Sequence, residues 1–338
     1  MVIGASGQIG RPAVAALERD GWDVTAASRG GGRDGSWGAG VRAVRLDRTG
    51  DGALAAVVGD GFDLVVDVVA YDAGHARQLT DLAGRIGSAV VISSVSVYED
   101  AKGRGFDTLE EPDGFPAYPV PVTETQPTVA PGETTYSTRK AALERELLAK
   151  GEELPTTVLR AGAVHGPYSP LPRELYFVKR HLDGRGRRVL AYGGESRFHP
   201  ASARNIAELV RLAAARPGSR VLNAGDPQAP TVAGIAAAID AVMGTESETT
   251  LVDGPPPAGS VGRTPWSGPL PVVLDMSAAE RELGYRPAVS YEESLPETVE
   301  WLRQRLAEGD WRECFPLLAR AYPDLFDYAA EDAWSAGT

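Results

Sequence analysis

The stretch Gly4-Ala5-Ser6-Gly7-Gln8-Ile9-Gly10 decides the fold, because it sets three glycines at a spacing of three between two regular elements. Val2-Ile3 before it is a short apolar strand, and residues 9–19 after it carry apolar side chains at helical spacing. In such a strand–turn–helix unit, one glycine allows a sharp turn, another lets the backbone approach a pyrophosphate, and the third lets helix and strand pack. The helix N-terminus adds free amides and a partial positive charge. We therefore predict that Gly4, Ser6, Gly7, Gln8, Ile9 and Gly10 bind a dinucleotide.

Strand-like and helix-like stretches alternate through the first half of the chain. We predict strands near residues 23–27, 41–46, 64–69, 89–93 and 156–159, and helices over 73–86 and 134–150. This order is typical of a doubly wound parallel sheet. The segment 99–133 interrupts it with Pro, Gly and acidic residues, and an irregular segment this long is usually functional or mobile.

The alternation loosens past Gly166. We predict helices over 174–182, 203–215 and 231–243, a strand at Val221-Leu222, an irregular segment over 253–271, a helical stripe from Leu295 to Leu306, and one more helix after Trp311. The chain is therefore expected to form an α/β fold in which residues 1–165 and about 201–245 bind the dinucleotide. A smaller C-terminal lobe, over about residues 166–200 and 246–338, is expected to bind the substrate.

The residues after the second strand bear on which dinucleotide binds. NAD sites usually place an acidic residue there for the ribose 2′-hydroxyl, whereas this chain has Ser28-Arg29-Gly30. A hydroxyl and a guanidinium suit a 2′-phosphate, and Arg11 after the third glycine could add a second positive charge. The sequence therefore favours NADP, held through Ser28 and Arg29. NAD is the alternative if Arg29 is only a surface residue.

Tyr136 and Lys140 lie four residues apart in the predicted helix over 134–150, so they share one face. A nearby ammonium lowers the pKa of a tyrosine by favouring the phenolate. Such a tyrosine can act as general acid or base toward a carbonyl or an alcohol. The alternative is a surface tyrosine above a surface lysine.

Three serines, Ser93, Ser94 and Ser96, follow one another at the end of the predicted strand over 89–93. The carboxyl ends of parallel strands are where open α/β sheets bind ligands. A serine hydroxyl there could donate a hydrogen bond to a substrate oxygen. The alternative is a serine that ends the strand by bonding nearby backbone.

With these residues the chain resembles the extended short-chain dehydrogenase/reductases of the NAD-dependent epimerase/dehydratase family. In that family a glycine turn opens the chain, S-S-x-x-V-Y follows the fifth strand, and Y-x-x-x-K and L-R-P-x-x-V-x-G-P come next. The last motif starts here at Leu159, with Ala161 in place of the proline. The resemblance continues through residues 221–225 and ends at Glu282-Leu283-Gly284-Tyr285-Arg286-Pro287, so it spans nearly the whole chain.

The resemblance implies a Rossmann-type domain with a catalytic triad of Ser94, Tyr136 and Lys140. The substrate carbonyl would bind between Ser94 and Tyr136, and Lys140 would hold the nicotinamide ribose and tune Tyr136. A homodimer formed through helices that include the one carrying Tyr136 is also implied. Further cofactor contacts implied by the resemblance are Asp47, Val69, Ala70, Ala161 and Val164.

One stretch departs from the family pattern. Sugar-nucleotide enzymes of the family carry R-D-F-x-H-V-x-D after the substrate loop, whereas the stretch here, Arg197 to Asn205, lacks the acidic residue and offsets the arginine. This departure weakens the case for a nucleoside diphosphate-sugar substrate. The candidate substrate contacts are Ser96, Tyr98, His165, Arg197 and His199. The four histidines show no metal-ligand spacing, so no metal is predicted.

Composition excludes several classes of function. The 34 Lys and Arg residues against 46 Asp and Glu residues give a net charge of −12, which disfavours binding to nucleic acid or an anionic membrane. Cys314 is the only cysteine, so no internal disulfide is expected, and this fits the cytoplasm. No apolar run approaches the ~20 residues of a membrane helix, and no signal peptide is expected. Only three residues precede Gly4, so the first strand is short or the natural start lies upstream.

Three hypotheses remain open on the sequence alone. The leading one is an enzyme that exchanges NADP(H) with solution and moves hydride at a secondary alcohol or ketone of a small molecule. The second is an epimerase or dehydratase that keeps its NAD(P) and returns the hydride to the same substrate, for which a nucleotide sugar is one candidate. The third, of another class, is a non-catalytic NADPH-binding sensor, which the presence of Ser94, Tyr136 and Lys140 disfavours.

Overall fold

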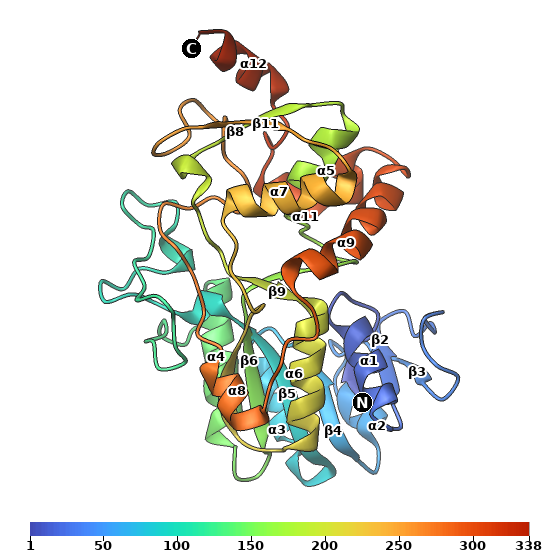
Figure 1. Cartoon of the computed structure of the whole chain (residues 1–338). Coiled ribbons are helices and arrows are strands. Elements are labelled where there is room, and N and C mark those ends of the chain that lie inside the picture. The colour runs from blue at the N-terminus through green and yellow to red at the C-terminus, as the bar shows by residue number, and fades with distance from the viewer. Residues whose placement is uncertain (338) are drawn as a thin grey trace. The chain divides into compact units, whose positions relative to one another are not determined.

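The structure, a computed structural model, describes residues 1–337 and divides into two compact units. The first unit consists of Met1–Gly162, Ala203–Gly225 and Leu274–Ala288. The second consists of Ala163–Ser202, Asp226–Val273 and Val289–Thr338, of which the last residue lies outside the described chain. Both units are therefore built from segments far apart in the sequence, as the colours of Figure 1 show.

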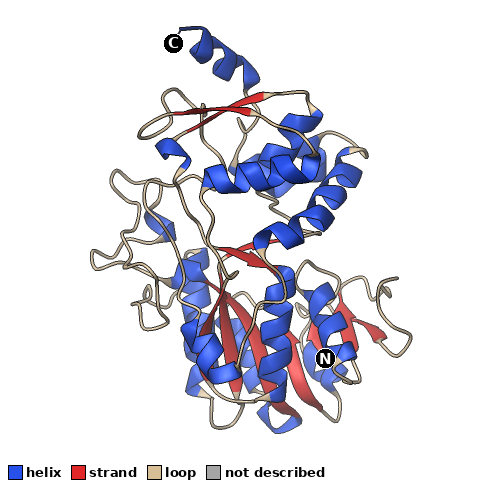
Figure 2. Ribbon diagram, viewed as in Figure 1, coloured by secondary structure: helices blue, strands red, loops and turns tan. Residues whose placement is uncertain are grey.

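A seven-stranded parallel sheet forms the centre of the first unit, in the order β10-β6-β5-β4-β1-β2-β3 (Figures 1 and 2). Its strands are β1 (Val2–Ile3), β2 (Thr25–Ser28), β3 (Arg42–Arg45), β4 (Phe62–Asp67), β5 (Ile86–Ser94), β6 (Thr156–Ala161) and β10 (Arg220–Ala224). The order steps outward from β1 in both directions, which is the doubly wound arrangement predicted from the sequence. The predicted fold class is thereby confirmed.

Helices cover both faces of this sheet. They are α1 (Gly10–Arg19), α2 (Ala53–Val58), α3 (Ala73–Thr80), α4 (Tyr136–Ala149), α6 (Ala203–Ala215) and α8 (Ser277–Leu283), with short 3₁₀ turns at Ala83–Arg85, Val95–Val97 and Phe106–Thr108. The helices α1 and α6 pack together, and α3 packs against α4. Leu54, Leu79 and Leu143, from α2, α3 and α4, bury their side chains in one cluster with the strands. Burial of these apolar side chains is the main force that holds the layers together.

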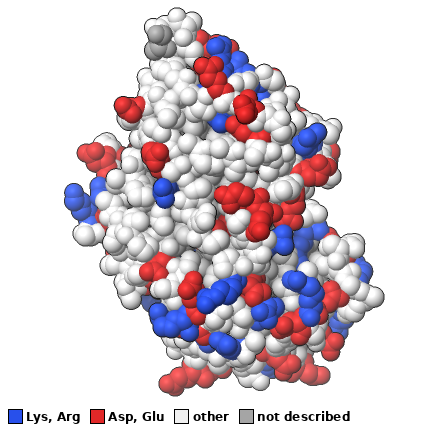
Figure 3. Space-filling model, in the orientation of Figure 1, with Lys and Arg blue, Asp and Glu red and all other residues white. Residues whose placement is uncertain are grey.

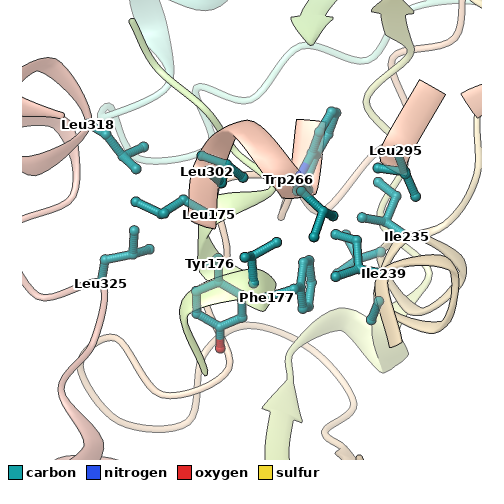
Figure 4. Close-up of a cluster of buried hydrophobic side chains, with 14 of the residues drawn as sticks. Leu175, Tyr176, Phe177, Ile235, Ile239, Trp266, Leu295, Leu302, Leu318 and Leu325 are labelled. Carbon is teal, nitrogen blue, oxygen red and sulfur yellow. The ribbon is translucent and has the colours of Figure 1, made fainter. Parts of the chain in front are cut away.

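The second unit has two small parallel sheets and six helices. The strand β7 (Ala163–His165) pairs with β9 (Pro200–Ser202), and β8 (Arg187–Leu190) pairs with β11 (Glu248–Leu251). The helices are α5 (Leu175–Leu182), α7 (Val232–Met243), α9 (Tyr291–Leu306), α10 (Trp311–Cys314), α11 (Pro316–Ala321) and α12 (Tyr328–Gly337), with a 3₁₀ turn at Tyr192–Gly194. Figure 4 shows their core, in which Phe177, Trp266 and Leu295 come from three separate segments.

Two segments lie in a different unit from the one expected from the sequence. The helix α7 belongs to the second unit, because Val232, Ile235 and Ile239 pack into the core with α5 and α9. Residues 274–288 belong to the first unit, where the Asp275 amide donates to the Val122 carbonyl and α8 packs on β10 and α6. The tail beyond Trp311 forms three helices where one was expected.

Candidate active site

The carboxyl edge of the large sheet collects most of the predicted site residues. All strands of this sheet are parallel, so they end at the same edge. The glycine turn follows β1, Ser28 ends β2, Asp47 follows β3, Val69 follows β4, and Ser94 and Ala161 end β5 and β6. Ligands of open α/β sheets bind at this edge, so the geometry is consistent with the predicted dinucleotide site.

The glycine turn is shaped as a phosphate cradle. Gly4 has φ +84°, a conformation that favours glycine, and a Cβ on Gly10 would lie 2.2 Å from the Gly4 carbonyl oxygen. Ser6 and Gly7 are exposed at the tip of the turn. The residue before α1, Ile9, makes no side-chain hydrogen bond that would cap the helix N-terminus. An uncapped helix N-terminus offers its amides and partial positive charge to an anion, so the residues present fit a pyrophosphate.

The end of β2 carries the groups expected to distinguish NAD from NADP. Ser28 is buried and its hydroxyl accepts from the Gly31 amide at 3.1 Å, whereas Arg29 is exposed. Arg11 forms an ion pair with Asp34, a residue that the sequence analysis did not consider. Asp47 is exposed, and the hydroxyl and amide of Thr49 lower the pKa of its carboxylate. Of the two arginines that favoured NADP, one is therefore already paired with an acid.

The residues that follow β4 include an exposed apolar side chain at the same edge. The Val69 side chain is exposed, which is unusual for a large apolar residue at the end of a buried strand, while Ala70 is buried. Ala161 at the end of β6 is also buried. An exposed apolar side chain here fits contact with a planar ring of a bound cofactor.

Tyr136 and Ser94 come together at the centre of this edge. Tyr136 is the first residue of α4, and the Ser94 hydroxyl lies close enough to lower the pKa of its phenol. Burial raises the pKa of Tyr136, although 43% of the residue is exposed, while the Ser94 hydroxyl lowers it and Tyr71 raises it further. The expectation that Lys140 lowers this pKa is therefore not met in the protein alone, because the surrounding protein disfavours the phenolate.

Lys140 lies one turn along α4 from Tyr136 and is only 6% exposed. Its ammonium donates to the carbonyl oxygens of Ala70, at 2.6 Å, and Ile92, at 2.9 Å. It lies 5.7 Å from the centre of the Tyr136 ring. Burial lowers its pKa to about 8, and the carboxylates of Asp67 and Glu144 oppose that shift. Since an ammonium has three donors, one N–H is left for a further partner such as a ribose hydroxyl.

The three serines at the end of β5 have separate surroundings. Ser93 points into the interior and donates to Glu144 Oε1 at 2.5 Å. Ser94 is half-buried; besides meeting Tyr136, its hydroxyl accepts from the Ser96 amide at 3.2 Å, so it also caps the following turn. The buried Ser96 hydroxyl has no hydrogen-bond partner among residues 1–337. Ser94 is therefore the one of the three that is placed to work with Tyr136.

Tyr98, predicted as a substrate contact, is part of the interior. It is 1% exposed, and its hydroxyl donates to Asn223 Oδ1 at 2.6 Å. The Arg160 guanidinium lies 4.8 Å from the centre of its ring. Burial raises the pKa of Tyr98 to about 12. These contacts hold Tyr98 in the interior with its hydroxyl already bonded to Asn223.

The sequence analysis missed two features next to the triad. The Tyr71 ring lies 5.6 Å from the Tyr136 ring, at a tilt of 52°. Asp67, fully buried at the end of β4, pairs with Arg48, which also donates to the His75 carbonyl at 3.1 Å. An acid inside an otherwise apolar strand was the available signal for the second feature. The first had none, because Tyr71 and Tyr136 are distant in the sequence.

The remaining predicted residues, Val164, His165, Arg197 and His199, lie in the second unit. His165 is 1% exposed, and its Nε2 lies 2.6 Å from Asp226 Oδ2, which raises the pKa of His165 against the opposing effect of burial. His199 Nε2 lies 2.7 Å from the Asp226 carbonyl oxygen. Arg197 is exposed and Val164 is half-buried. The two histidines thus share one buried aspartate within their own unit.

Metal and membrane signals are absent from the described chain. Residues 1–337 contain no group of three or more His, Cys, Asp or Glu side chains that could hold a metal ion. None of the helices in that range is both long and apolar enough to cross a bilayer.

Comparison with known proteins identifies a matching family model and solved structures with a similar fold. The model of the NAD dependent epimerase/dehydratase family matches residues 1–225. No curated protein matches the chain in sequence. Among solved structures, UDP-galactose 4-epimerase is similar over 90% of this chain and 98% of that chain, with a TM-score of 0.65 and 20% identity.

Two further solved structures from Bacillus cereus are similar to the same extent. UDP-glucuronic acid 4-epimerase in complex with UDP-glucuronic acid and NAD is 16% identical, with a TM-score of 0.66 and coverage of 90% of this chain and 98% of that one. UDP-N-acetylglucosamine 4-epimerase is 17% identical, with a TM-score of 0.66 and coverage of 89% and 98%. At these identities the likeness establishes the fold.

Proposed function

The chain belongs to the NAD dependent epimerase/dehydratase family, and from this premise we propose that it is an enzyme that moves hydride at a secondary alcohol carbon of a small molecule and returns it to the same molecule. This is the epimerase or dehydratase alternative of the sequence analysis. The observation that carries it is the position of the buried Lys140, whose ammonium lies 5.7 Å from the centre of the Tyr136 ring and donates to the Ala70 and Ile92 carbonyls. The family membership and the NAD bound to a structural neighbour support it over a freely exchanging NADP reductase.

Each triad residue has a separate task in this proposal. A bound nicotinamide would supply the acceptor and donor of the hydride. Tyr136 takes the proton from the substrate hydroxyl when the carbon is oxidised and returns it when the carbonyl is reduced. Ser94 donates a hydrogen bond to the same substrate oxygen, and Lys140 holds the ribose with its remaining N–H. The raised pKa of Tyr136 means that the protein alone holds the protonated form, so Tyr136 must release this proton before it takes one from the substrate hydroxyl in the oxidation step.

The structural neighbours and one stretch of sequence bear on which class of small molecule is the substrate. The structural neighbours are named for UDP-sugars, and a ring carbon bearing a hydroxyl suits the proposed chemistry. The stretch from Arg197 to Asn205 lacks the acidic residue typical of sugar-nucleotide members. We therefore propose a sugar or a similarly hydroxylated small molecule, and leave the nucleotide part outside the proposal.

A single measurement separates this function from the exchanging reductase. The protein is purified without added cofactor and denatured, and any released nucleotide is identified by mass spectrometry. Stoichiometric NAD is the expected result, because an enzyme that returns hydride to its own substrate has no need to release its cofactor. An empty protein that oxidises or reduces a substrate only with added dinucleotide would contradict the proposal and favour the reductase.

A further inference from the structure

The loop that follows β2 places a carboxylate against the only arginine in the first turn of α1. The Arg11 guanidinium forms an ion pair with Asp34; the two side chains are 22% and 14% exposed. Arg11 Nε also donates to the Ser6 carbonyl at 2.9 Å. Arg11 is thus tied at once to the glycine turn and to Asp34. The phosphates and the adenosine ribose of a dinucleotide bind between this turn and the end of β2.

Asp34 is held in place by its own loop. The Ser36 amide donates to Asp34 Oδ1 at 2.9 Å, and the Ser36 hydroxyl donates to the same oxygen. The Arg33 guanidinium stabilises the loop by donating to the Trp37 carbonyl at 2.8 Å and to the carbonyls of Gly38 and Val41. The Gly38 amide then donates to Glu18 Oε2 on α1 at 3.0 Å. The loop is therefore attached to α1 at two points, through Asp34 to Arg11 and through Gly38 to Glu18. These contacts hold the Asp34 carboxylate against Arg11.

We propose that Asp34 makes the site select NAD over NADP, by pairing with Arg11 and by opposing a 2′-phosphate. A 2′-phosphate carries close to two negative charges. When it binds, it loses hydrogen bonds to water, and bidentate hydrogen bonds from arginine guanidinium groups can replace them. Here one of the two nearby arginines, Arg11, already has a carboxylate partner, so a 2′-phosphate would have to displace Asp34 to pair with it and would then lie beside its negative charge. The 2′-hydroxyl of NAD is neutral, so it neither needs a free arginine nor is repelled by the Asp34 carboxylate. This inference rests on the proposed function only in requiring that a dinucleotide binds.

The inference reverses the preference drawn from the sequence. The acid that usually marks an NAD site stands at the end of the second strand, where this chain has Ser28 and Arg29. Asp34 lies six residues beyond Ser28, too far along the chain to be counted with that position. The fold of the loop brings it back to the first turn of α1.

The test is equilibrium binding of NADH and NADPH to the protein freed of nucleotide, followed by nicotinamide fluorescence. The wild-type protein is expected to bind NADH more tightly. Asp34→Asn removes the charge and keeps the shape, so Arg11 becomes available and the affinity for NADPH should rise about tenfold or more, as a charge-assisted pair with phosphate allows. The affinity for NADH should change by less than about threefold on the same scale.

Two further variants make the comparison specific. Asp60→Asn removes one exposed charge just before β4, at the opposite edge of the same sheet, and should leave the NADH-to-NADPH ratio unchanged. Arg11→Ala combined with Asp34→Asn should lose the NADPH gain, because the gain is assigned to Arg11. Circular dichroism of each variant confirms that it is folded.

Three results would overturn the inference: tighter binding of NADPH by the wild type, an unchanged ratio in Asp34→Asn, or a gain that persists in the double variant. Absence of binding of either dinucleotide to every folded variant would overturn the proposed function and this inference together. The two failures are therefore distinguishable.

Discussion

Tyr136 shows how a side chain acquires its chemistry from its surroundings. The sequence places a tyrosine and a lysine on one helical face, and that spacing suggests a tyrosine whose pKa is lowered. In the structure the pKa is raised, because burial outweighs the lowering effect of the Ser94 hydroxyl and Tyr71 raises the pKa further. In the protein alone, Tyr136 therefore favours its protonated, neutral form.

Replacement of Tyr136 by Phe tests its role as acid and base. The ring and its packing against Tyr71 are kept, while the exchangeable proton is lost, so turnover should fall by at least about 100-fold. Turnover of the purified variants on the identified substrate is the measurement. Tyr168→Phe, at an exposed tyrosine of the second unit, serves as the matched control and should keep its activity. Turnover of Tyr136→Phe equal to that of the wild type would show that another group carries the proton.

The lowered pKa of Lys140 predicts a pH dependence of stability. The pKa is 10.5 in the unfolded chain and about 8 in the fold, so between these values the unfolded state binds more protons. The contribution of this group to the free energy of unfolding should therefore rise as pH increases from about 8 toward 10. The measurement is the difference between wild type and Lys140→Met in urea unfolding at several pH values. A difference that stays constant over this range would mean that Lys140 titrates as an ordinary lysine.

At the scale of elements, α4 connects the site to the interior. Tyr136, Lys140 and Glu144 recur every four residues and so follow one face of the helix. Glu144 accepts from Ser93 on β5 and pairs with Arg160 on β6 at 2.7 Å. Asp107 accepts from the hydroxyls of Thr135, at 2.7 Å, and Ser137, at 2.8 Å, at the start of the helix. These contacts fix the helix at both ends of its catalytic face.

Glu144→Ala tests the inner connection. It leaves the Arg160 guanidinium buried without its carboxylate, and breaking a buried pair in this way costs about 3–5 kcal/mol of unfolding free energy. The measurement is chemical denaturation. Glu152→Ala, an exposed residue beyond the end of α4, should change the same quantity by less than about 0.5 kcal/mol. Equal effects of the two variants would show that the Glu144–Arg160 pair does not stabilise the fold.

At the scale of the whole molecule, the two units have separate hydrophobic cores. The first carries the glycine turn and the triad, and the second buries aromatic side chains around Trp266 together with the His165–Asp226 pair. Acidic and basic side chains are interspersed on the face drawn in Figure 3, while the net charge is −12. A surface of this kind gives an anionic ligand no long-range attraction, so the proposed binding of a dinucleotide would depend on local contacts.

Local binding to the folded first unit predicts a ligand-dependent stability. NAD at 100 times its dissociation constant should stabilise the nucleotide-free protein by about 2.7 kcal/mol, because it binds only the folded form. Thermal unfolding with and without NAD is the measurement. Free adenine at the same concentration is the control and should stabilise less, since it lacks the pyrophosphate that the glycine turn holds. An unfolding temperature that NAD leaves unchanged would contradict the assigned dinucleotide site.

Much of the fold and the triad could be predicted from the sequence because the signals are local. The glycine spacing, the apolar runs and the Tyr136–Lys140 interval each depend on residues within one or two turns of one another. The helix predicted over 203–215 matches α6, and the one over 174–182 matches α5 to within a residue. The family resemblance is confirmed, since the family model matches residues 1–225.

The sequence by itself thus determined the parallel sheet, the glycine turn and the spacing of Tyr136 and Lys140, because their patterns are set by neighbours along the chain. Only the tertiary structure decided which unit α7 joins and that Asp34 pairs with Arg11. These outcomes depend on contacts between residues far apart in the sequence, where burial and charge pairing in space replace spacing along the chain as the controlling factors.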